Sequence, residues 1–152
     1  MRSWGFTSVS IDESGSLRGE VCGARPGTTL LFDGHLDTVP VPDRAAWSLD
    51  PFGGILRDGK VWGRGATDMK GGVAAMVVAI ASLAEGPRDF PGRVAFSGTV
   101  SEETLGWASF LPVVSRLRPE YVVIGEPSDL VLCRGQRGRF EFRVVTRGRA
   151  AQ

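Results

Sequence analysis

Residues 28–37 read Thr-Thr-Leu-Leu-Phe-Asp-Gly-His-Leu-Asp, a stretch that predicts a central strand and the polar residues at its end. Its first half, residues 28–32, is a short apolar run without alternation, which is typical of a buried strand in a parallel sheet. Its second half places polar side chains directly after that strand. In open α/β sheets, ligands bind beyond the carboxyl ends of the strands. A functional site is therefore expected among the polar residues that follow the strands.

Outward from this stretch, strands and helices alternate along the chain. Apolar residues at helical spacing, ended by Gly86-Pro87, predict a helix from about 69 to 84. A second helix is predicted over 105–117, with Pro112 as a weak point. Strands or hairpin arms are predicted at 6–11, 17–22, 54–63 (a hairpin around Asp58-Gly59), 93–100, 121–124, 131–133 and 140–145. This order predicts an α/β fold with a mostly parallel sheet.

Composition narrows the class of protein. The 152 residues suit one domain, and 18 Lys and Arg against 17 Asp and Glu give a formal charge of +1, so nucleic acid and anionic membranes are not expected as partners. Cys22 and Cys133 are too few for a disulfide scaffold and are expected to be buried free thiols. The longest apolar run, 73–81, is too short to cross a bilayer, and the N-terminus has no apolar signal core. We therefore expect a soluble, cytoplasmic protein.

Candidate site residues follow several of the predicted strands or precede the first helix. They are His35, Asp37, Asp68, Glu102, Glu103 and Glu126. One imidazole among several carboxylates suits Zn²⁺, Mn²⁺ or Co²⁺. Asp68 is the candidate bridge between two metal ions, with His35, Glu103 and Glu126 as terminal ligands. A glutamate left free of the metal would take a proton from water and pass it to a leaving amine, so the indicated chemistry is hydrolysis of an amide-like bond.

Structural explanations stay open for each candidate residue. His35 and Asp37 could form a local polar pair, and Asp68 could be a helix N-cap. The two adjacent glutamates could lie in a solvated loop, and Asp129 could take the place of Glu126. The arginine-rich stretch 134–149 fits the polar face of a strand, or a site that recognises a substrate carboxylate.

Four blocks of sequence occur in order: HLDTVP at 35–40, GRGATDMKGG at 63–72, SEETLG at 101–106 and GEPS at 125–128. They resemble the co-catalytic zinc aminoacylase and carboxypeptidase family, which includes acetylornithine deacetylase, succinyl-diaminopimelate desuccinylase and carboxypeptidase G. The resemblance covers about residues 30–149. It implies a zinc-peptidase-like three-layer sandwich, two Zn²⁺ ions per site, and cleavage of an amide bond in an N-acyl amino acid or small peptide.

The resemblance also implies a role for each candidate residue. His35 and Glu126 would bind one zinc ion, Glu103 the second, and Asp68 would bridge them. Asp37 would be the partner of His35, and Glu102 the general base. A cis peptide is expected at Asp68–Met69.

The chain departs from the family pattern in three ways. It has no second histidine, its helix before the first strand is missing, and residues 136–152 resemble only the first strand of the lid through which family members often dimerise. We therefore expect residues 1–135 to be the N-terminal part of a catalytic domain with an incomplete sheet, and a chain that exposes apolar surface and self-associates. The alternatives to a hydrolase are a catalytically inactive remnant that still binds metal, and a plain α/β domain that binds none.

Overall fold

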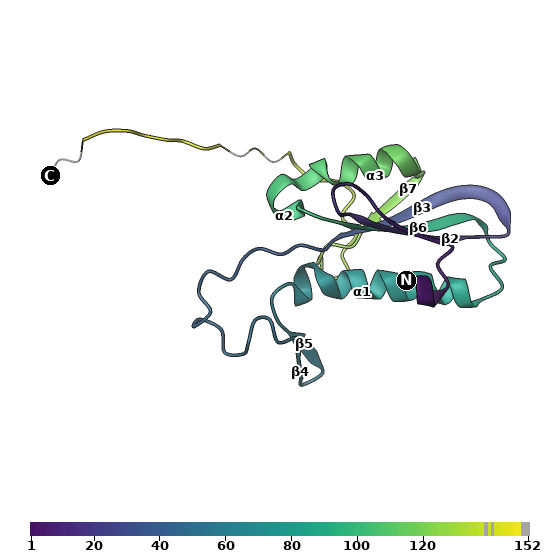
Figure 1. The fold of residues 1–152 in the computed structure, drawn as a ribbon, viewed down its shortest axis with the longest axis horizontal. Coiled ribbons are helices and arrows are strands. Elements are labelled where there is room, and N and C mark those ends of the chain that lie inside the picture. Colours follow the sequence, from purple (N-terminus) through teal and green to yellow (C-terminus); the bar gives the residue numbers. More distant parts are fainter. Residues whose placement is uncertain (139, 141, 150–152) are drawn as a thin grey trace.

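A five-stranded sheet with helices on both faces forms the centre of the computed structural model, which describes residues 1–138, 140 and 142–149 (Figure 1). The strand order is β1-β2-β6-β3-β7. Helix α1 covers one face, and α2 and α3 lie on the other (Figure 1). This arrangement confirms the expected three-layer α/β fold. The strands are β1 (Ser8–Ile11), β2 (Leu17–Cys22), β3 (Arg25–His35), β6 (Pro91–Thr99) and β7 (Tyr121–Ile124), and the helices are α1 (Gly71–Glu85), α2 (Glu102–Leu105) and α3 (Phe110–Leu117).

The sheet is mixed, which corrects the expectation of a mostly parallel sheet. Strand β3 pairs in parallel with β6 and with β7, whereas β1 with β2 and β2 with β6 are antiparallel. A tight turn after β1 sets the antiparallel β1–β2 pair. There the Asp12 carboxylate accepts hydrogen bonds from the amides of Ser14 and Ser16, at 3.0 and 2.9 Å. Strands joined by so short a turn run antiparallel, so the hairpin predicted there is confirmed.

Helix α1 follows an irregular turn at Ala66–Lys70, in which Asp68 and Met69 have non-helical backbone angles, and buries Met76, Ile80 and Ala81 against the sheet. Its core partners include Phe96, which is fully buried. By length and composition alone, the helical stretch Ala66–Glu85 could cross a membrane. The core helix of a water-soluble domain passes the same test. In this stretch Met76, Ile80 and Ala81 pack on the sheet, whereas Val78 and Leu83 are exposed.

The second predicted helix, over 105–117, is broken. It consists of α2, a 3-10 turn at Gly106–Ala108, and α3. The break occurs at Gly106, whose φ of 53° ends α2, rather than at Pro112. Pro112 lies in the first turn of α3, where its missing N–H has no partner to lose. Helix α3 buries Val113 and Leu117 against Leu31 and Ala95 of the sheet.

Some of the other local predictions are confirmed and others are wrong. The hairpin around Asp58-Gly59 is present as β4 (Ile55–Arg57) and β5 (Lys60–Trp62). The strands predicted at 131–133 and 140–145 are wrong for the residues that the structure describes. Residues 131–133, 140 and 142–145 are exposed and lie in no strand, and residue 141 lies outside the described part of the chain. Cys22 and Cys133 are free, as expected, but exposed rather than buried. Cys22 ends β2 at the rim of the sheet, which accounts for its exposure.

Candidate metal centre

One face of β3 and β6 changes from apolar to polar toward the carboxyl ends of the strands. Leu31 lies opposite Ala95, then Asp33 opposite Ser97, then His35 opposite Thr99. These six side chains are all buried. The apolar pair packs under α3, while the polar pairs continue to the end of the sheet. Alternation along β3 therefore carries an aspartate and a histidine to the place where a site was expected.

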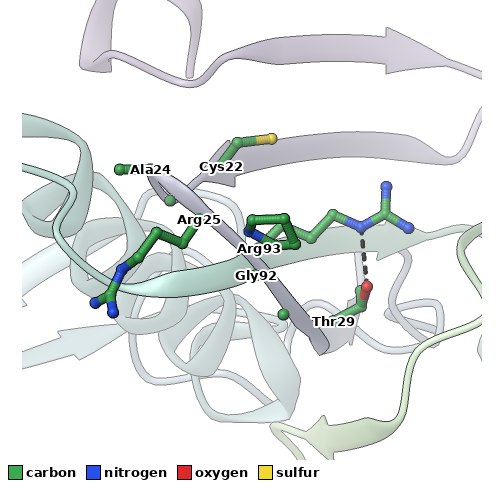
Figure 2. Close-up of a pocket in the computed structure, with 9 residues that line it drawn as sticks. Cys22, Ala24, Arg25, Thr29, Gly92 and Arg93 are labelled. Atoms are coloured by element: carbon green, nitrogen blue, oxygen red, sulfur yellow. Dashed lines mark hydrogen bonds between the residues drawn. The ribbon is translucent and has the colours of Figure 1, made fainter.

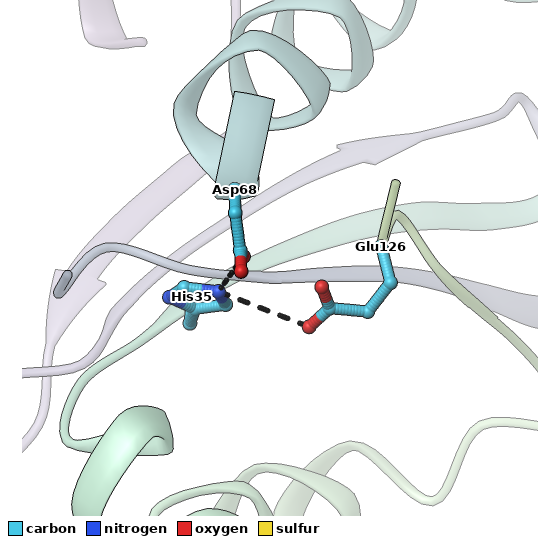
Figure 3. A group of neighbouring side chains, drawn as sticks. All are labelled: His35, Asp68 and Glu126. Carbon is cyan, nitrogen blue, oxygen red and sulfur yellow. Dashed lines mark hydrogen bonds and ion pairs between the residues drawn. The ribbon is translucent and has the colours of Figure 1, made fainter. Parts of the chain in front are cut away.

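His35 is almost fully buried, with 2% of its surface exposed, and its ring is oriented by two contacts. Nδ1 lies 2.9 Å from the carbonyl oxygen of Asp37. A carbonyl oxygen only accepts hydrogen bonds, so we assign the hydrogen to Nδ1. Nε2 then faces Asp68, whose Oδ1 is 2.8 Å away (Figure 3). This orientation leaves Nε2 as the nitrogen available to a metal ion.

Asp68 and Glu126 converge on the same nitrogen (Figure 3). Glu126 Oε1 is 3.8 Å from Nε2, and one ligand atom from each of the three residues lies within 4.8 Å of the others. Two ligands of a tetrahedral Zn²⁺ at 2.0–2.1 Å are roughly 3.3 Å apart. The two carboxylates are about half exposed, so the site is open to solvent. One imidazole and two carboxylates at these separations fit one ion with an open position. The peptide Asp68–Met69 is cis, as expected.

The electrostatics of this group favour a cation. Burial alone would lower the pKa of His35, but the hydrogen bonds with Asp68 and Asp37 and the charge of Glu126 raise it overall. Burial raises the pKa of Glu126, an effect that the charge of His35 opposes and the nearby carboxylates Asp68, Glu102 and Glu103 reinforce. The carboxylates around His35 therefore favour positive charge at Nε2, which is where a metal ion would bind.

The remaining candidates lie near this group but outside it. Glu103 is not one of the three converging residues. It lines a cleft of about 240 Å³ together with Asp68, Arg64 and Trp47. The carboxylate of Asp37 lies 3.7 Å from Nδ1 of His35, beyond hydrogen-bond distance. It instead accepts hydrogen bonds from the backbone amides of Glu102 and Glu103, each at 3.1 Å.

Two residues of the site were missed by the sequence analysis. Asp33 is buried beside His35 and accepts a hydrogen bond from Ser97. Its position two residues before His35 on a strand was the available signal, since such residues share a face. Arg64 lies with its guanidinium 5.1 Å from the ring centre of Trp47 and lines the cleft. It was quoted within a block but given no role.

A larger cleft, of about 500 Å³, lies at the other end of the sheet, where β3 and β6 begin (Figure 2). It is lined by Cys22, Arg25 and Arg93, among others. Arg25 pairs with Asp89 at 3.2 Å. Arg93 bonds Thr29 at 3.0 Å and Glu20 at 2.9 Å. Both guanidinium groups already have carboxylate partners, so this cleft offers an anion little free charge.

Residues 31–149 match the family model described as peptidase family M20/M25/M40. The chain belongs to this family. The match covers most of the chain and includes all six candidate site residues, so the family resemblance seen in the four sequence blocks is confirmed.

Among curated members and relatives, the uncharacterized protein YgeY of Escherichia coli K12 is 36% identical over 151 residues, which are 97% of this chain and 37% of YgeY. Succinyl-diaminopimelate desuccinylase of Caulobacter sp. K31 is 39% identical over 140 residues, with 83% of this chain and 35% of that protein covered. The chain thus spans about a third of the length of the curated relatives it matches.

Two solved structures have the same fold as this chain. Human carnosine dipeptidase 1 superposes with a TM-score of 0.64 at 27% identity, covering 81% of this chain and 30% of that one. The M20 metallo-carboxypeptidase Sso-CP2 of Sulfolobus solfataricus gives a TM-score of 0.65 at 22% identity, covering 78% of this chain and 28% of that one. At 22% identity this second match shows the fold alone.

Proposed function

We propose that this chain carries part of the active site of a metal-dependent amidohydrolase that cleaves an amide bond in an N-acyl amino acid or small peptide. The observation that carries the proposal is the convergence of His35, Asp68 and Glu126 within 4.8 Å in a chain of the M20/M25/M40 family.

His35, Asp68 and Glu126 would hold one Zn²⁺ ion, and Glu103 a second ion bridged by Asp68, with Co²⁺ or Mn²⁺ as substitutes. Bound zinc lowers the pKa of water and polarises a carbonyl group. The open side of the site supports this assignment, because the carboxylates of Asp68 and Glu126 remain about half exposed.

Glu102 would act as the general base, taking a proton from water and passing it to the leaving amine. Two observations support this role. Glu102 is only partly buried and lies near enough to raise the pKa of Glu126 through charge. It is also absent from the group of three converging ligand residues, which fits a group that transfers protons rather than one that binds metal.

The substrate class rests on the relatives. The Caulobacter relative is named a succinyl-diaminopimelate desuccinylase, which indicates removal of an acyl group from an amine. The human structural relative is a dipeptidase. Both names describe hydrolysis of an amide bond in a small molecule, and we propose the same class here.

The test is hydrolysis of N-acetyl and N-succinyl amino acids and of dipeptides by the full chain loaded with Zn²⁺. Glu102→Gln is expected to abolish turnover while zinc binding, measured by calorimetry, stays within about twofold of wild type. Glu85→Gln is the matched control, because Glu85 is an exposed carboxylate at the far end of α1. Turnover by Glu102→Gln equal to wild type would contradict the role of Glu102.

A metal-binding chain without activity is the second candidate. It is favoured by the position of Glu103 outside the three-residue group. Zinc binding that is lost in Asp68→Ala, with no turnover by wild type on any substrate, would establish it. A wild-type chain that neither binds zinc nor turns over any substrate would instead favour the plain α/β domain.

Two further expectations remain part of the proposal. We propose that residues 1–135 are the N-terminal part of the catalytic domain and that 136–152 begin a lid. We also propose a cytoplasmic location, which the free state of Cys22 and Cys133 supports. Cell fractionation with a thiol-reactive label would test the location.

A further inference from the structure

The carboxylate of Asp37 accepts hydrogen bonds from the backbone of Glu102 and Glu103, which lie 65 and 66 residues further along the chain. Oδ1 accepts the amide of Glu102 and Oδ2 the amide of Glu103, both at 3.1 Å. We propose that Asp37 is a positioning residue for these two glutamates. This inference rests on the proposed function, because it assigns a cause to the placement of the general base and of the second-ion ligand.

The contacts of Asp37 divide between its backbone and its side chain. Its carbonyl oxygen holds Nδ1 of His35 at 2.9 Å, while its carboxylate is 3.7 Å from the same nitrogen. The imidazole is therefore oriented by the backbone of Asp37, and the side chain is free to hold the glutamates. One residue thus ties the histidine side of the site to the acidic side.

Helix α2 needs such an outside partner. It has four residues, and its own N-cap, Ser101, makes no side-chain capping hydrogen bond and has a left-handed φ of 63°. The first amides of any helix lack partners within the helix. A carboxylate is the strongest acceptor for them, since charge-assisted hydrogen bonds are roughly twice as strong as neutral ones. Asp37 supplies both acceptors, one oxygen to each amide.

The two parts of the site should respond differently to loss of the Asp37 carboxylate. His35, Asp68 and Glu126 converge without the help of the Asp37 carboxylate. Glu102 and Glu103 depend on it. Asp37→Asn keeps the shape of the side chain but presents an NH2 group to one of two N–H donors, so it should release the glutamates and leave the other three residues in place.

The first measurement is amide hydrogen exchange by NMR in the metal-free full chain. In Asp37→Asn, the amides of Glu102 and Glu103 are expected to exchange about tenfold faster than in wild type or more, as loss of a charge-assisted hydrogen bond predicts. Asp37→Glu, which keeps two carboxylate oxygens, should restore part of the protection. Asp12→Asn is the matched control, because the Asp12 carboxylate also accepts two backbone amides, those of Ser14 and Ser16, in a turn away from the site.

The second measurement is zinc calorimetry on the same variants. Asp37→Asn and Glu103→Gln should each weaken binding of the second ion, the one assigned to Glu103, by about tenfold, and the double variant should weaken it no further. The affinity for the ion held by His35, Asp68 and Glu126 should stay within about twofold of wild type. Unchanged exchange at Glu102 and Glu103 in Asp37→Asn, or faster exchange spread over β3 and β6, would overturn the proposal. A chain that binds no zinc would refute the proposed function, whereas the exchange of these two amides would still decide the role of Asp37.

Discussion

Replacing Asp33 by asparagine should stabilise the metal-free protein at neutral pH. Asp33 is 7% exposed on β3, and its carboxylate accepts a hydrogen bond from Ser97. Burial raises the pKa of Asp33 to about 6, although the bond from Ser97 and the charge of His35 oppose the rise and the charge of Glu102 adds to it. Asparagine has the same shape and an oxygen that can accept the Ser97 hydroxyl, but it has no charge to bury.

The size of the effect follows from the pKa. Between the ordinary aspartate pKa of 3.8 and about 6, the folded state holds a proton that the unfolded state has released, so stability falls as pH rises through this window. At about 1.36 kcal/mol per pH unit, the difference amounts to ~3 kcal/mol, to be read as an order of magnitude. Above pH 6 the loss is complete and stays constant.

Urea unfolding of wild type and Asp33→Asn at pH 4, 5, 6 and 7, with a chelator present, measures the difference directly. Asp33→Asn should gain stability relative to wild type as pH rises, by up to ~3 kcal/mol between pH 4 and 7. Asp12→Asn provides a control of opposite sign. Although burial opposes it, the hydrogen bonds from Ser14 and Ser16 and the charge of Arg18 lower the pKa of Asp12, so its contribution is lost as pH falls. A difference between Asp33→Asn and wild type that is constant over this range, or that shrinks with pH, would refute the reasoning.

Two other perturbations test the packing around the site and the edge of the sheet. A Cβ on Gly72 would lie 2.6 Å from the carbonyl oxygen of Gly125, which precedes Glu126, so Gly72→Ala should displace Glu126 and weaken zinc binding about tenfold. Gly135→Ala is the control, because a Cβ there meets nothing within 4 Å. Equal zinc affinities of the two variants in calorimetry would contradict the contact. All four residues of the edge strand β7 are exposed and apolar, so wild type should self-associate and bind an apolar dye. Val123→Lys should raise the monomer fraction measured by sedimentation. A wild-type monomer that binds no dye would refute this prediction.

Elements specified by neighbouring residues could be predicted from the sequence. The hairpin between β1 and β2, the turn at Asp58-Gly59 and the end of α1 at Gly86 all depend on turn or helix-ending residues within a few positions. The strand expected at 140–145 shows the limit. Its alternation of Phe140, Phe142 and Val144 describes a strand that could pair, but an alternating pattern does not provide the partner.

The site was predictable to the extent that it consists of strand ends. His35 is the last residue of β3, Glu126 lies two residues after the end of β7, and Asp68 lies shortly before α1. The partner of the Asp37 carboxylate could not be read in the same way. Aspartate two residues after a histidine predicts a local pair, whereas the observed acceptor geometry joins segments 65 residues apart. Such a contact depends on the order of the strands in the sheet, which no local pattern specifies.

That order explains why the acidic residues reach His35 at all. Strand β3 lies between β6 and β7 and runs parallel to both. Any residue that follows β6 or β7 must therefore emerge beside the end of β3. The hydrogen-bond ladder continues past the strand ends, with the Leu36 amide donating to Thr99 at 2.7 Å on the β6 side and the Gly125 amide donating to Asp33 at 2.9 Å on the β7 side. Glu126 is thus held on one side of His35 and the Glu102–Glu103 pair on the other. A change that uncouples β7 should remove Glu126 and leave the glutamate pair, whereas loss of the Asp37 carboxylate should do the reverse.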